Sequence, residues 1–108
     1  MKLGLKERLL ARGLLPQQGS MLTLMVVKRA FEVLSLTAEE VEKWHVADAV
    51  DADGKAVGTR WDVEANEPME VALEPATVDV IKKELKALDE KKTLTMDLMS
   101  TYEAFMGA

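Results

Sequence analysis

Residues 20–34 restrict the fold more than any other segment, because apolar side chains occupy nearly every side of the helix that they predict. Ser20 is a suitable N-cap for this helix. The spacing i, i+3, i+7, i+10 predicts one buried face made of Leu24, Val27, Phe31 and Leu34, widened by Met25, Val26, Ala30 and Val33. The charged side chains left for solvent are Lys28, Arg29 and Glu32. A helix of this kind lies at the centre of its domain or faces a second subunit.

Charge is divided unevenly along the chain, whose formal net charge is -5. Glu7 is the one acidic residue before Glu32, whereas the basic residues of this segment are Lys2, Lys6, Arg8, Arg12, Lys28 and Arg29. The remainder of the chain is strongly acidic. Such a division predicts contacts with other macromolecules or with a second copy of the chain.

Further helical patterns lie on both sides of the middle of the chain. A first helix is expected over residues 3–15, where Gly13 and Pro16 form a stop signal. Thr37 and Glu40 fit a capping box that begins a short third helix. After Pro75, helical spacing returns in two sets, Val78, Ile81, Leu85 and Leu88, then Leu94, Leu98, Tyr102 and Phe105.

The middle of the chain has the pattern of short strands. Asp53-Gly54 predicts a type I′ hairpin turn. Alternation then predicts that Trp61 and Val63 share a face of one strand, and that Met69, Val71 and Leu73 point inward from the next. We therefore expect a single α+β domain, with about five helices and a small antiparallel β-meander or hairpin inserted between the third and fourth helices. Its parts are an N-terminal helical part (1–45), the meander (46–74) and a C-terminal helical pair (75–108).

The sequence contains no pattern typical of an active site or a metal site. There are no cysteines and one histidine, His45, and no serine lies in a nucleophile motif beside it. A calcium loop aligned on Gly54 would place Ala49 and Arg60 at positions that require acidic ligands. The glycines are isolated, so no phosphate-binding loop is present. We expect a protein that is not an enzyme and that binds no cofactor or metal.

The basic segment leaves two kinds of partner open. Nucleic acid would bind its lysines and arginines through phosphates, with strong dependence on salt. Against this partner stand the acidic remainder, a pI of about 4.9, and the lack of stacking aromatics among the basic residues. The alternative, which the charge balance favours, is that Lys2, Lys6, Arg8 and Arg12 pair with carboxylates of the same chain or of a second copy.

The location expected from the sequence is the cytoplasm. No stretch approaches the roughly 18 apolar residues of a membrane span, and the longest apolar-rich run, 21–27, is interrupted by Thr23. Charged residues close to the N-terminus leave no hydrophobic region for a secretion signal. We expect no contact with a membrane.

Both ends of the chain resemble a family of small phage and prophage proteins. The N-terminal strings are LKERLL (5–10), GLLP (13–16), Gly19 and TL (23–24), and the C-terminal strings are ELKALDEKK (84–92), LT (94–95) and YEAF (102–105). The family has no assigned activity. The resemblance implies a phage-encoded accessory or assembly protein, and it transfers no functional residues.

The function expected from the sequence is that of a non-catalytic protein–protein interaction protein of phage or prophage origin. We expect it to form a homo-oligomer, with a phage or host protein as a further partner. The candidate interaction surface is Lys6, Arg8, Arg12, Met25, Lys28 and Arg29. The alternatives are a protein that binds nucleic acid and a counter-defence protein that sequesters a small ligand.

Overall fold

In the computed structural model, which describes residues 1–107, the N-terminus pairs with a segment far along the chain. Lys2–Leu3 (β1) and Met69–Glu70 (β4) form a short antiparallel sheet, with Leu3 opposite Met69. The ammonium group of Met1 donates to the Glu70 carboxylate at 2.8 Å and to the Val71 carbonyl at 3.2 Å. This pairing brings residues about 70 positions apart into contact.

The helices are Leu5–Gly13 (α1), Met21–Leu34 (α2), Ala38–Lys43 (α3), Pro75–Glu90 (α4) and Met99–Met106 (α5). Short 3-10 turns lie at Val63–Asn66 (η1) and Met96–Leu98 (η2). Two predicted caps are confirmed. Ser20 Oγ accepts a hydrogen bond from the Thr23 N–H at 3.2 Å, and Thr37 forms a complete capping box with Glu40. These local bonds satisfy amide groups that an uncapped helix leaves unpaired.

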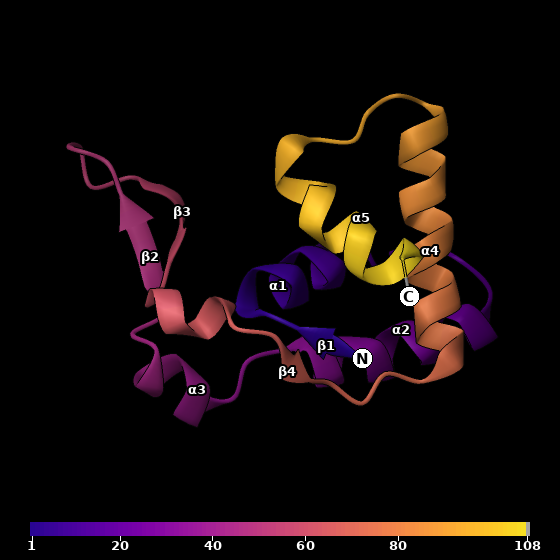
Figure 1. Ribbon diagram of the computed structural model, residues 1–108, viewed down its shortest axis with the longest axis horizontal. Helices are drawn as coiled ribbons and strands as arrows, with labels where there is room; N and C mark the ends of the chain where they lie inside the picture. The colour runs from indigo at the N-terminus through magenta and orange to yellow at the C-terminus, as the bar shows by residue number, and fades with distance from the viewer. Residues whose placement is uncertain (108) are drawn as a thin grey trace.

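The main core lies where α1, α2, α4 and α5 meet (Figure 1). α1 packs on α2 and α5, and α4 packs on α2 and α5. The largest fully buried apolar side chains of this cluster are Leu3, Leu34, Ile81, Leu85 and Phe105. A second cluster contains Leu5, Trp44 and Ala65 and lies towards α3 and η1.

Ala47–Val50 (β2) and Ala56–Arg60 (β3) form a hairpin that projects from the rest of the chain (Figure 1). The predicted hairpin is present, but the predicted type I′ turn is wrong, because Asp53 does not have the positive φ that this type requires. The Gly54 N–H instead donates to the Asp51 carbonyl at 3.0 Å, so Ala52 and Asp53 are the central residues of the turn, and Gly54 follows them with φ 78°. The Asp51 carboxylate accepts hydrogen bonds from the N–H groups of Asp53 and Lys55, both at 2.9 Å. Every residue of β3 is exposed, so the hairpin is held chiefly by its own two strands.

The coarse prediction of a chain that mixes helices with small antiparallel sheets is confirmed, but the single meander is wrong. β4 pairs with β1 and not with the hairpin, so there are two separate two-stranded sheets. Val63, expected inside a strand, begins η1 and is 76% exposed. The Trp61 indole N–H instead donates to Asn66 across this turn at 2.8 Å. The predicted C-terminal range ends on Ala108, which lies outside the described residues.

Candidate interaction surface

α2 contacts the rest of the molecule along a narrow strip. Ala30 and Leu34 are its only buried side chains, and they face α1 and α4. The prediction that Leu24 and Phe31 belong to a buried face is wrong, because Leu24 is 36% and Phe31 50% exposed. Val27, on the same side as Ala30, packs against the core and is partly buried, so its predicted place on the buried face is confirmed.

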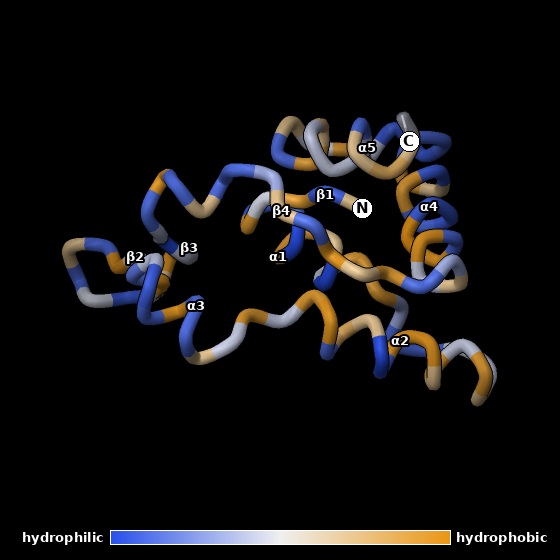
Figure 2. The backbone as a smooth tube through the Cα atoms, turned by 60° about the horizontal axis from the view of Figure 1, so that its bottom comes forward, coloured by the Kyte–Doolittle hydropathy of each residue, from blue (hydrophilic) through white to orange (hydrophobic). Residues whose placement is uncertain are grey.

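The outward side of α2 is largely apolar. We define the α2 face as Met21, Leu22, Leu24, Met25, Lys28, Phe31, Glu32 and Val33, all of which are exposed. Met21 and Leu22 are the most exposed, at 74% and 76%. Hydrophobic residues follow one another along α2 at the periphery of the molecule (Figure 2). Contiguous apolar patches of this kind on a soluble domain mark sites of interaction.

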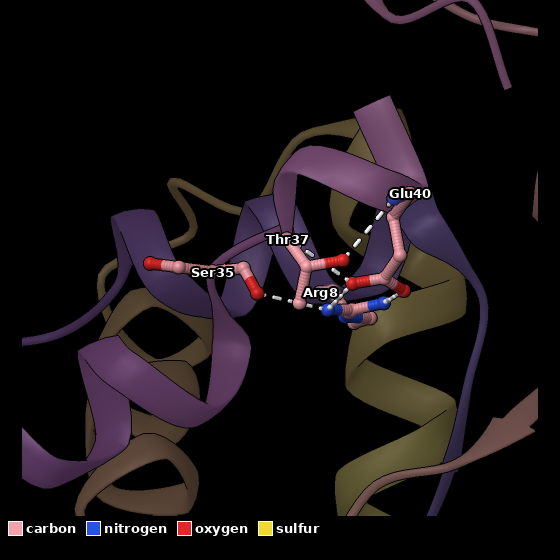
Figure 3. A network of polar contacts seen from close by, with 4 residues as sticks. All are labelled: Arg8, Ser35, Thr37 and Glu40. Atoms are coloured by element: carbon pink, nitrogen blue, oxygen red, sulfur yellow. Dashed lines mark hydrogen bonds and ion pairs between the residues drawn. The ribbon is translucent and has the colours of Figure 1, made fainter. Parts of the chain in front are cut away.

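Arg8, expected on the interaction surface, is instead buried, with 6% of its surface exposed. Its guanidinium donates to both carboxylate oxygens of Glu40, at 2.6 and 3.1 Å, and to the Ser35 carbonyl at 2.9 Å (Figure 3). The pKa of Glu40 is lowered, chiefly because Arg8 donates to its ionised form. Arg8 therefore joins α1 to the connection between α2 and α3 and is not available to a partner.

Three of the other basic residues predicted for this surface, Lys6, Arg12 and Arg29, also have contacts inside the chain. Lys6 lies 3.9 Å from Asp97, and Arg29 pairs with Glu74 at 3.0 Å. The guanidinium of Arg12 stacks over the Phe31 ring at 5.2 Å from its centroid. Of the two open alternatives, pairing within the same chain is thus observed for Lys6 and Arg8, whereas Arg12 contacts an aromatic ring in place of a carboxylate.

Of the predicted surface residues, the structure places Met25 and Lys28 together in the α2 face. Sequence reasoning missed the other six members of this surface, which are Met21, Leu22, Leu24, Phe31, Glu32 and Val33. The nearly continuous apolar character of α2 indicated a helix that lies at the centre of its domain or faces a second subunit. Periodicity does not show which side, because a helix that is apolar all round has no unique buried face.

His45 forms a polar pair at the base of the hairpin. Its Nδ1 lies 2.7 Å from the Asp62 carboxylate, and its backbone has φ 51° at the end of α3. Both side chains are well exposed, and the Asp62 carboxylate raises the pKa of His45. The Asp62 N–H also donates to the Trp44 carbonyl at 2.9 Å, so the pair lies where the end of α3 contacts the segment after β3.

Searches of the described residues for metal sites and membrane spans, and comparisons with known proteins, gave no positive result. Residues 1–107 contain no group of three His, Asp or Glu side chains that could hold a metal ion. None of the helices described is both long enough and apolar enough to cross a membrane. Comparisons with protein-family models, curated proteins and solved structures found no match.

Proposed function

We propose that this protein is a non-catalytic interaction protein that associates with itself through the α2 face. The observation that carries the proposal is the exposure of Met21, Leu22 and Phe31 on a helix that buries only Ala30 and Leu34. Covering these side chains removes apolar surface from water, which favours association against the entropy that two molecules lose when they join. A second copy that covers this face supplies that burial.

The internal salt bridges support this proposal over nucleic-acid binding. Arg8 is buried against Glu40, while Lys6 and Arg29 lie beside carboxylates. A phosphate backbone would have to compete with these carboxylates for the same cations. Six of the eight exposed side chains of the α2 face are apolar, which favours a protein surface as the partner.

The origin and location of the protein stay predictions. The resemblance at both ends of the chain is the basis for proposing a phage or prophage accessory or assembly factor. A cytoplasmic site of action follows from that origin, since such factors work where the host ribosome makes them. Neither prediction is needed for the self-association proposed above.

Sedimentation velocity across the micromolar range tests the proposal. We expect the wild-type protein to form an oligomer, and Leu22→Glu to weaken it at least about tenfold, because a carboxylate would be buried in the interface. Val57→Glu is the matched control, since Val57 is 64% exposed on the hairpin and lies outside the α2 face. A wild-type protein that stays monomeric at low salt overturns the proposal.

A further inference from the structure

Two opposite charges lie on the α2 face directly opposite its packed side. Lys28 and Glu32 are each two residues from the buried Ala30, which at 3.6 residues per turn places both on the far side of the helix from it. Both side chains are exposed. Neither takes part in a salt bridge with any of residues 1–107.

These two charges are poorly suited to pair with each other. A lysine four residues before a glutamate is the weaker orientation of an i, i+4 pair, because each charge then opposes the helix dipole. An interface that buried these two charges without partners would be destabilised by several kcal/mol, because each charge would be removed from water without compensation. Any copy that covers the apolar side chains around Lys28 and Glu32 must therefore supply them with opposite charges.

We infer that two copies associate through antiparallel α2 helices related by a two-fold axis at the level of Ala30. This inference rests on the proposed self-association and names its geometry. In that arrangement Lys28 of each copy is level with Glu32 of the other, so one contact is made twice. Repetition of a contact about the axis is the property of an isologous two-fold interface.

A parallel arrangement of the same helices has the opposite electrostatics. Lys28 would face Lys28, and Glu32 would face Glu32, in the middle of an apolar contact. Like charges placed against each other at an interface disfavour that pairing. The charges at positions 28 and 32 thus favour the antiparallel orientation. With the axis at Ala30, the two α2 helices overlap over residues 26–34, which includes Phe31 and Val33. Met21 and Leu22 lie beyond the end of the partner's α2, level with the segment that follows it.

Charge reversal on the full chain tests this geometry by sedimentation. We expect Lys28→Glu and Glu32→Lys each to weaken the homodimer at least about tenfold, because each places like charges opposite one another. Mixing the two single variants restores association as a heterodimer, and so does the double reversal within one chain. Lys55→Glu, on the exposed hairpin, is the matched control and leaves the dimer unchanged.

A cysteine at Met21 gives a second measurement, in a chain with no other cysteine. With the axis at Ala30, the two Met21 positions are eighteen residues apart along the helices, or roughly 27 Å at 1.5 Å per residue. Met21→Cys should therefore not form a disulfide between the copies under oxidising conditions. In a parallel dimer the two cysteines would be adjacent and would cross-link.

The outcomes separate this inference from the proposed function. A monomeric wild-type protein overturns both. A wild-type dimer that is not weakened by the single reversals, or that cross-links efficiently through Met21→Cys, overturns the antiparallel geometry alone. Circular dichroism and thermal unfolding of every variant establish that a lost dimer is not a lost fold.

Discussion

At the scale of the residue, Arg8 has the most demanding position in the chain. It is 6% exposed, and its guanidinium is held by the Glu40 carboxylate and the Ser35 carbonyl. Its Nε has no hydrogen-bond partner in residues 1–107. A buried charge is costly unless it is paired, so Arg8 and Glu40 depend on each other.

Replacing Arg8 with methionine should lower the free energy of unfolding by about 2–4 kcal/mol, because Glu40 and the Ser35 carbonyl lose their shared donor. Arg12→Met on the same helix is the control. Its guanidinium stacks on the half-exposed Phe31 ring, a contact that contributes about 0.5–1 kcal/mol. Urea unfolding measures both variants. Equal losses would contradict the structural role of the Arg8 pair.

At the scale of the element, the structure depends on how closely the start of α1 approaches η1. Gly4 is buried, and a Cβ at this position would lie 2.5 Å from the backbone oxygen of Asn66. A methyl group added to Gly13, at the other end of α1, would have no described atom within 4 Å beyond its own stretch of helix. At the start of α1 the close approach of Asn66 leaves no room for a side chain at Gly4, whereas at the end of the helix Gly13 could be replaced without a clash.

Gly4→Ala should destabilise the protein by about 1–3 kcal/mol, because two backbone segments would have to separate. Gly13→Ala should leave stability unchanged or raise it by up to about 1 kcal/mol, since alanine is the better helix residue. Thermal unfolding of the two variants beside the wild type checks the contrast. A Gly4→Ala protein as stable as Gly13→Ala would show that η1 moves away without cost.

The sequence predicts an element well when the residues that determine it lie close together in the chain. Ser20 and Thr37 act within four residues, and both caps are confirmed. The Asp53-Gly54 signal places the hairpin correctly but predicts the wrong turn type, because its central residues are Ala52 and Asp53. β1 pairs with β4 so that Leu3 lies opposite Met69, a residue far along the sequence. No local pattern around either residue indicates that the two segments pair. The candidate surface falls between these cases, because periodicity identifies α2 but not which of its sides is covered.

At the scale of the whole molecule, the uneven charge is matched in part by ion pairs inside the fold. Arg8 pairs with Glu40, Lys6 with Asp97 and Arg29 with Glu74, and the N-terminal ammonium group pairs with Glu70. The cations come from the first 31 residues and the carboxylates from later segments. These contacts tie the N-terminal helices to α3, β4, the start of α4 and η2.

Acid should loosen these ties. The pKa of Glu40 is lowered by Arg8, and that of Glu70 by the N-terminal ammonium group. A carboxyl whose folded pKa is lowered contributes stability above its ordinary pKa of 4.5, and the contribution is lost as the pH falls through the folded value. His45 acts in the opposite sense, since its raised pKa favours the fold below 6.5 and ceases to do so as the pH rises through the folded value.

The prediction is that Glu40→Gln reduces the slope of unfolding free energy against pH on the acid side of 4.5, relative to the wild type. Part of the slope should remain, because Glu70 still titrates. Urea unfolding at a series of pH values measures it. An unchanged slope would mean that Arg8 holds Glu40 equally well in its protonated form.

The projecting hairpin has a consequence for what the chain tolerates. Its tip at Asp53-Gly54 is exposed and contributes nothing to either apolar cluster. Exposed tips of this kind accept extra residues, and each doubling of loop length costs only about 0.6 kcal/mol in closure entropy. An epitope or a fluorescent reporter inserted between these two residues should leave the helical core intact. The same site is where the length of this chain can change most freely in evolution.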